Sequence, residues 1–165
     1  MNYEKLKRYI RTPKSIEDKL DEIDTVSRNS GLALEKKVDF LLKIYDSLSD
    51  DKKGQREGRY LIIRIGEVYF QENAFEDALD NYGFVMRFKN TVGNPFLHLR
   101  LGQIQYHIKN KERMHDELSR ALIMGGEIVF EDENSKFIEI PKSVLREPEN
   151  CSWKEYDGQD WESTK

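Results

Sequence analysis

Two stretches of the chain, 36 residues apart, carry the same spacing of a glycine and a bulky residue. Gly66 is followed sixteen positions later by Tyr82, and Gly102 is followed sixteen positions later by Leu118. A glycine in one helix lets a second helix approach closely, and a bulky side chain on that second helix fills the gap beside it. A repeat of this kind predicts successive pairs of closely packed helices.

The apolar residues around this repeat recur at intervals of three and four, which indicates helices along most of the chain. The expected helices run from Pro13 to a stop at 29–31, and then over about 32–48, 55–72, 75–88, 95–108 and 112–124. Two short helical pieces are expected over 127–130 and 134–140, and Pro141 is expected to end the second. Helices of this length, joined by turns of a few residues, pack as antiparallel neighbours.

The composition excludes several classes of function. A single cysteine, Cys151, and three histidines offer neither a disulfide framework nor ligands at metal-site spacing. No phosphate-binding loop or nucleophile motif is present, so we expect a protein that is not an enzyme and holds no metal or cofactor. The N-terminus lacks the apolar core of a signal peptide and no segment is apolar enough to span a bilayer, which predicts a cytoplasmic protein with no membrane partner. The acidic net charge of −4 argues against nucleic-acid binding.

A longer pattern surrounds both glycines. The matching residues are Ile62, Ile65, Gly66, Tyr69, Ala78 and Tyr82 in the first copy, and His98, Leu101, Gly102, Met114, Leu118 and Ala121 in the second. By these residues, the stretch 58–126 resembles the tetratricopeptide-repeat family, although Gln105 stands where the second copy should have Tyr. The alternative interpretation is an ordinary helical bundle in which the two glycines match by chance.

The resemblance implies an all-α fold, an α-solenoid of antiparallel helix-turn-helix units. We expect one helical domain over residues 1–146, with the two repeat units at its centre. Residues 12–50 fit the repeat pattern poorly and are interpreted as an atypical helix pair that caps the N-terminal side of the stack. Residues 127–146 form a short C-terminal capping segment, and residues 147–165 form an acidic tail that contains aromatic residues.

In this family the first helix of each unit lines a concave groove that binds peptides or protein segments. By position, the groove residues implied for this chain are Tyr60, Glu67, Phe70 and Gln71 from the first unit, and Phe96, Gln103, Tyr106 and His107 from the second. Aromatic residues are typical of protein-binding hot spots. The alternative left open is that several of them pack against the first helix pair or the C-terminal segment. Family members that clamp a terminal carboxylate use Lys and Arg here, so this chain is not expected to do so.

Two segments, Val92–Gln103 and Gly125–Glu133, are also similar to a group of small bacterial tetratricopeptide proteins. That group is associated with toxin neutralisation, as immunity partners of interbacterial toxins. The resemblance implies that this chain binds and neutralises a cognate bacterial toxin. A basic nuclease domain is one form that such a toxin can take. The competing hypothesis is an adaptor or regulator that binds peptide segments of partner proteins in its groove.

The acidic tail provides a separate reason to consider a basic partner. Residues 147–165 contain six acidic residues and two lysines, so they account for the whole net charge of −4. The tail residues expected to contact a partner are Trp153, Tyr156, Asp157, Asp160 and Trp161. Acidic groups opposite a basic nucleic-acid-binding surface raise the association rate and the specificity. The alternative is a solvated tail whose tryptophans fold back on the helices.

Overall fold

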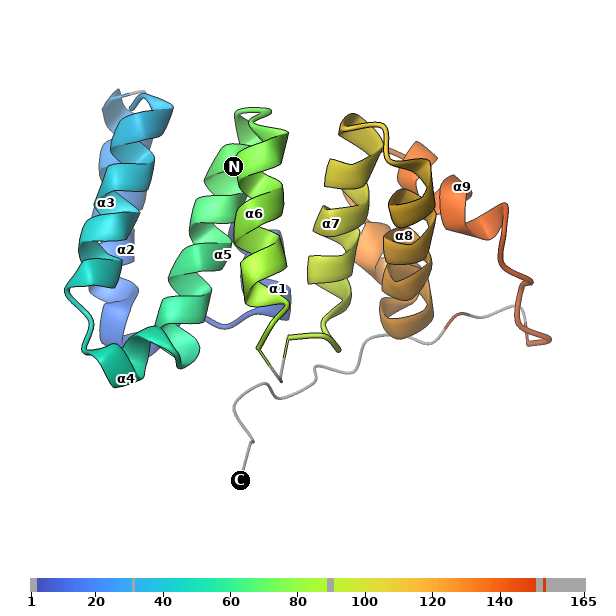
Figure 1. Ribbon diagram of the computed structural model, residues 1–165, viewed down its shortest axis with the longest axis horizontal. Coiled ribbons are helices and arrows are strands. Elements are labelled where there is room, and N and C mark those ends of the chain that lie inside the picture. The colour runs from blue at the N-terminus through green and yellow to red at the C-terminus, as the bar shows by residue number, and fades with distance from the viewer. Residues whose placement is uncertain (1–2, 31, 89–90, 151–152, 154–165) are drawn as a thin grey trace. The chain divides into compact units, whose positions relative to one another are not determined.

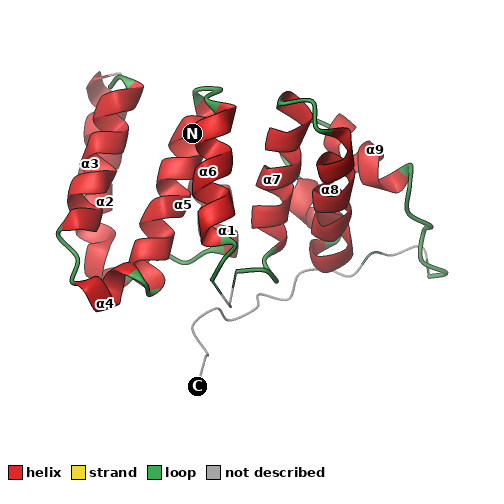
Figure 2. Cartoon of the chain, in the orientation of Figure 1, coloured by secondary structure: helices red, strands yellow, loops and turns green. Residues whose placement is uncertain are grey.

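The computed structural model describes residues 3–30, 32–88, 91–150 and 153 (Figure 1). Within these residues every regular element is a helix, nine of them α-helices and one a short 3₁₀-helix, so the all-α prediction is confirmed (Figure 2). The α-helices pack as sequential antiparallel pairs, as the short turns predicted. The chain divides into two compact units, Met1–Asn81 and Tyr82–Lys165.

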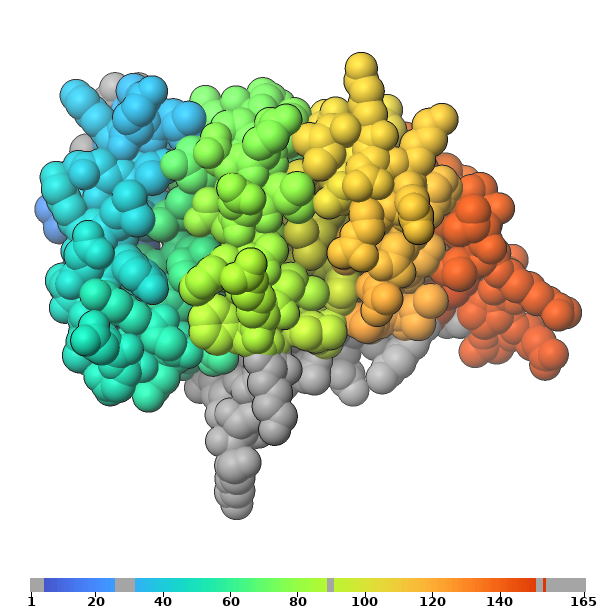
Figure 3. All heavy atoms as spheres, viewed as in Figure 1, coloured from blue at the N-terminus to red at the C-terminus, as the bar shows by residue number. Residues whose placement is uncertain are grey.

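The first unit contains α1 to α5 and the beginning of α6. Its helices are α1 (Tyr3–Tyr9), α2 (Lys14–Ser30), α3 (Leu34–Asp46), α4 (Asp50–Lys53), α5 (Arg56–Gln71) and α6 (Phe75–Val85), and α6 continues across the boundary between the units. Seen as in Figure 1, α3 lies in front of α2, and its atoms form the surface there in the space-filling view (Figure 3). Two large apolar side chains of α3, Phe40 and Leu42, are exposed.

The second unit contains a closely packed helix pair, α7 (Pro95–His107) and α8 (Lys111–Gly125). Its other elements are the 3₁₀-helix η1 (Glu127–Phe130) and α9 (Lys136–Lys142). Residues 95–105 of α7 are buried without interruption, so this helix is covered on all its sides. A Cβ atom added at Gly102 would lie 2.6 Å from the side chain of Leu118. The close approach that the glycine pattern predicted is therefore present between α7 and α8.

The turns after α5 and α7 have the same backbone geometry at the 36-residue offset. Asn73 and Lys109 both adopt left-handed backbone angles, with φ of 61° and 64°. After α5, the amide of Ala74 donates to the carbonyl of Tyr69 at 2.9 Å; after α7, the amide of Asn110 donates to the carbonyl of Gln105, also at 2.9 Å. The preceding amides, those of Asn73 and Lys109, both donate across 3.2 Å to the carbonyl three residues earlier. Each α-helix therefore ends in a Schellman turn, which satisfies its last carbonyl groups.

Three elements differ from the sequence prediction. Helix α1 was not predicted. Helix α4 lies in the polar stretch between the helices expected over 32–48 and 55–72. Pro141 was expected to end the last helix, but it lies inside α9, which continues to Lys142. Near the end of a short helix a proline removes one hydrogen bond only, and the amide of Ser143 still donates to the carbonyl of Glu139. Helices of seven and four residues are too short to show a clear apolar period, which is why α1 and α4 were not predicted.

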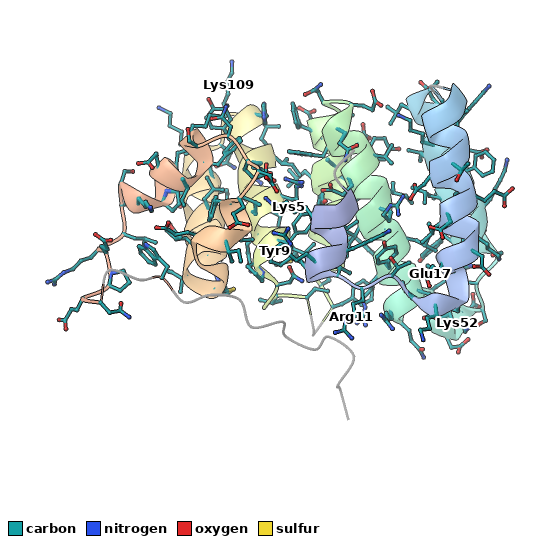
Figure 4. The ribbon with its side chains drawn as sticks, turned by 180° about the vertical axis from the view of Figure 1, so that it is seen from behind. Lys5, Tyr9, Arg11, Glu17, Lys52 and Lys109 are labelled. Atoms are coloured by element: carbon teal, nitrogen blue, oxygen red, sulfur yellow. The ribbon has the colours of Figure 1, made fainter. Side chains whose placement is uncertain are left out.

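The packing of α1 explains why it forms despite its short length. Leu6, Tyr9 and Ile10 are buried, and Lys5 is buried as well. Lys5 and Tyr9 lie on α1 and Arg11 follows in the connection to α2 (Figure 4). A helix of seven residues is not stable alone in water, so burial of these side chains holds it in place. Within the described ranges, no helix combines the length and apolar character needed to cross a lipid bilayer.

Candidate functional site

The groove residues predicted from the sequence fall into two classes according to their place along α5 and α7. Tyr60 and Glu67 of α5 are each 1% exposed, and their counterparts 36 residues later, Phe96 and Gln103 of α7, are 0% and 1% exposed. The other four lie in the last turn of each helix. Phe70 and Gln71 are half-buried, whereas Tyr106, at 38%, and His107 are exposed. Only the C-terminal ends of the two helices offer the predicted residues to a partner.

The buried residues of α5 are covered by the N-terminal part of the chain. The hydroxyl of Tyr60 lies 2.8 Å from the hydroxyl of Thr12, in the connection between α1 and α2. One turn earlier, the guanidinium of Arg56 donates to the backbone carbonyl of Arg11 at 3.3 Å. Because the sequence did not reveal α1, it did not reveal that this connection lies over the start of α5.

The middle of α5 is closed by an ion pair with α2. The guanidinium of Arg64, 1% exposed, donates from Nη2 to Oδ1 of Asp24 at 2.6 Å. Arg64 lies three residues before Glu67 on the same helix, so this pair occupies the stretch where the groove was expected. Helix α2 of the expected first helix pair therefore contacts the middle of α5.

The middle of α7 is closed by a related polar network. Arg100 lies 36 residues after Arg64, and its Nη1 donates to Oε1 of Gln103 at 2.6 Å and to Oε1 of Glu133 at 3.0 Å. Gln103 in turn donates from Nε2 to Oε2 of Glu133 at 2.7 Å. Glu133 follows η1, in the predicted C-terminal capping segment. Gln103 is therefore engaged by the chain's own acidic residue and does not face a partner.

His98, which the sequence matched to the large residue of the repeat, joins a loop to α8. Its Nε2 lies 2.7 Å from the carbonyl oxygen of Val92, and its Nδ1 lies 2.7 Å from Oε2 of Glu117. A carbonyl oxygen only accepts, so Nε2 donates to Val92. Arg113 also reaches Glu117, at 3.3 Å. Both His98 and Glu117 are buried, and their contacts hold the residues before α7 against α8.

The exposed end of α7 carries a cluster of aromatic rings around a lysine. The amine of Lys136, at the start of α9, lies 4.1 Å from the ring centroid of Tyr106 and 4.8 Å from that of Phe137. The rings of Tyr106 and Phe137 meet edge to face, with centroids 5.4 Å apart. The ring of His107 contacts Tyr106 at the same centroid distance. The sequence indicated Tyr106 and His107, but nothing in it placed Lys136 and Phe137 beside them.

The electrostatics of this cluster are positive. Partial burial, and then the charge of Lys136, lower the pKa of His107 below its ordinary value. Both effects disfavour a second positive charge on the imidazole. Lys109, at the tip of the α7–α8 turn, is exposed (Figure 4). We call Tyr106, His107, Lys136 and Phe137 the α7–α9 cluster.

The remaining predicted contact residues lie in the tail. Trp153 is half-buried, whereas Tyr156, Asp157, Asp160 and Trp161 lie outside the described residues. In the described part of the chain, no group of three or more His, Cys, Asp and Glu side chains is arranged to hold a metal ion. No protein-family model matches the sequence, and no curated protein or solved structure matches it at a significant level.

Proposed function

We propose that this chain is a non-enzymatic protein-binding module built from tetratricopeptide-like helical hairpins, and that it binds and neutralises a cognate bacterial toxin. The observation that carries the first part is the 36-residue repetition of structure. The same Schellman turn follows α5 and α7, and each helix buries its first two predicted groove residues and leaves the last two less buried. Repeated hairpins that expose aromatic residues at equivalent places are typical of helical repeats that bind proteins.

The burial of the helix middles bears on which kind of partner is proposed. A peptide lying along a concave groove needs contact with side chains at the positions of Tyr60, Glu67, Phe96 and Gln103. All four are buried, and two of them are engaged within the chain, Tyr60 by Thr12 and Gln103 by Glu133. The end of α7, where Tyr106 is exposed, suits a folded partner that touches this end of the helix. This favours the toxin-binding hypothesis over the peptide adaptor.

A toxin neutraliser of this kind acts in the cytoplasm of the cell that it protects, in line with the sequence expectation. It needs one folded partner and a slow dissociation rate, because a free toxin molecule is harmful. An adaptor instead binds several short segments at about micromolar Kd. Stoichiometry and affinity therefore separate the two functions.

The test is a pulldown from the native host with the full chain as bait, followed by mass identification of the partners and titration calorimetry. We expect one stoichiometric partner at nanomolar Kd or tighter, encoded next to this chain and toxic when expressed without it. The variant Tyr106→Ala is expected to weaken its binding, with Phe40→Ala on the exposed side of α3 as the matched control. Several weak partners, bound equally by the Tyr106 variant, would exclude toxin neutralisation.

A further inference from the structure

Lys136 in the α7–α9 cluster is held in place by aromatic rings. Its amine lies 4.1 Å from the Tyr106 ring centroid and 4.8 Å from the Phe137 ring centroid. Contacts of an ammonium group with ring faces at these distances are attractive, because the faces carry negative partial charge. The side chain of a surface lysine otherwise samples many rotamers, so these rings restrict the amine to one place beside an exposed tyrosine.

A comparison within α9 shows what Lys136 lacks. Lys142, in the same helix, has its amine 2.6 Å from Oε1 of Glu127. Among the residues that the structure describes, no acidic side chain forms an ion pair with Lys136. The rings solvate its charge only in part, and its remaining N–H groups are available to an acceptor. Two lysines six positions apart on one helix are therefore in different electrostatic states, one neutralised and one not.

The surroundings of Lys136 repel a second cation and attract an anion. Partial burial, and then the positive charge of Lys136, lower the pKa of the neighbouring His107. An anion at this place gains from the charge of Lys136, and it offsets the repulsion that His107 experiences. The ring of Tyr106, 38% exposed, offers apolar surface next to the same amine.

We propose that the exposed Tyr106 ring and the amine of Lys136, which the buried Phe137 supports from beneath, form a docking site for an acidic side chain of a partner protein. The carboxylate of an Asp or Glu accepts hydrogen bonds from the Lys136 amine, and an apolar neighbour in the partner covers the Tyr106 ring. Such charge-assisted hydrogen bonds are stronger than neutral ones. A lysine that is already positioned by two rings loses less side-chain entropy on binding than a free one. The inference rests on the proposed protein-binding function and names the chemistry of one contact.

The test uses two matched peptides and the full chain. One peptide is N-acetylated Gly-Phe-Glu-Asp-Gly amide, and the other has Gln and Asn in place of Glu and Asp. Binding is followed by backbone amide shifts in nuclear magnetic resonance spectra of the wild type, Lys136→Met and Lys142→Met. We expect the acidic peptide to shift Tyr106, His107, Lys136 and Phe137, with a Kd on the order of 1 mM, as suits a single contact.

The expected differences between variants are specific. Lys136→Met weakens binding at least fivefold, whereas Lys142→Met, whose amine is already paired, changes it less than twofold. A bound carboxylate also raises the pKa of His107 toward its ordinary value, which the ring-proton shifts of His107 report. Circular dichroism of each variant shows whether its helices are intact.

Three results would overturn the proposal. They are equal binding of the amide peptide, equal binding to Lys136→Met, and shifts confined to other parts of the chain. A fourth would identify a different occupant: if neutralising the chain's own tail, by Glu155→Gln, Asp157→Asn, Asp160→Asn and Glu162→Gln, tightens peptide binding fivefold, the tail and not a partner occupies the site. The peptide titration needs no partner, so it can fail while the pulldown succeeds, or succeed while the pulldown fails.

Discussion

Helices α5 and α7 carry matching residues at a 36-residue offset, yet different parts of the chain cover them. Each carries a buried arginine at the 36-residue offset, Arg64 and Arg100. Arg64 pairs with Asp24, which precedes it in α2, whereas Arg100 pairs with Glu133, which follows it after η1. Each helix therefore has a buried arginine at the matching position. Its acidic partner comes from the segment that precedes α5 in the first unit, and from the segment that follows α8 in the second.

The comparison also explains why the predicted groove is reduced. In a long array, each unit is covered by its neighbours and the inner helices stay open to ligand. Here α2 reaches the middle of α5, and the segment after η1 reaches the middle of α7. Of the predicted groove residues, the less buried ones lie at the helix ends, and Tyr106 and His107 of the α7–α9 cluster are the most exposed of them.

The largest effect is expected from the two arginines. Arg64→Met and Arg100→Met should each lower the free energy of unfolding by about 3 kcal/mol, because each leaves a carboxylate partly buried without its main partner. Chemical denaturation measures both. Removing the acid as well, in Arg64→Met with Asp24→Asn and in Arg100→Met with Glu133→Gln, should recover part of the loss. If only one arginine matters, the equivalence of the two helices is wrong.

The close approach of α7 and α8 predicts the next largest effect. Gly102→Ala should lower the free energy of unfolding by about 2 kcal/mol, since its Cβ would lie 2.6 Å from the Leu118 side chain. Gly83→Ala is the matched control, because a Cβ there meets nothing within 4 Å. It should stabilise α6 by about 0.5 to 1 kcal/mol. Thermal unfolding of both variants measures these changes. A Gly102→Ala variant as stable as the wild type would argue against tight packing of α7 and α8.

The two Schellman turns differ in one residue type, and this predicts a smaller effect. Lys109 and Asn73 hold the same left-handed angle, which costs a lysine more than an asparagine. Lys109→Gly should therefore raise the free energy of unfolding by about 1 kcal/mol, and Asn73→Gly by no more than a few tenths. Equal gains at both positions would show that the asparagine gives no advantage in this turn.

The smallest effect concerns His107 and pH. Because burial and Lys136 lower its pKa in the folded state, the unfolded chain binds a proton more readily just below pH 6.5. The free energy of unfolding should thus fall as the pH drops from 6.5 through the lowered pKa. Above pH 6.5 the contribution of His107 is fully present. Lys136→Met should raise the pKa of His107, measured from its ring-proton shifts, and weaken this pH dependence. An unchanged pKa would mean that Lys136 does not act on His107.

The sequence predicted the helix pairs because apolar periodicity and the glycine spacing are local signals. It identified Gly102 correctly as a contact point, and it found the longer helices within a few residues. It missed α1 and α4, whose short lengths give little periodicity. Of the candidate contact residues, Tyr106 and His107 are exposed, whereas Tyr60 and Gln103 are buried by contacts with distant segments. No local pattern states that Thr12 meets Tyr60, or that Lys136 lies on Tyr106.

Amide hydrogen exchange of the full chain, with and without the partner captured by pulldown, tests most directly whether a partner binds at the helix ends. We predict that the partner slows exchange in the last turns of α5 and α7 and at the start of α9, around residues 70–71, 106–107 and 136–137. The middles of α5 and α7, closed by Arg64 and Arg100, should keep the exchange rates of the free chain. Protection confined to α2 and α3, or no protection by any captured protein, would contradict binding at these helix ends.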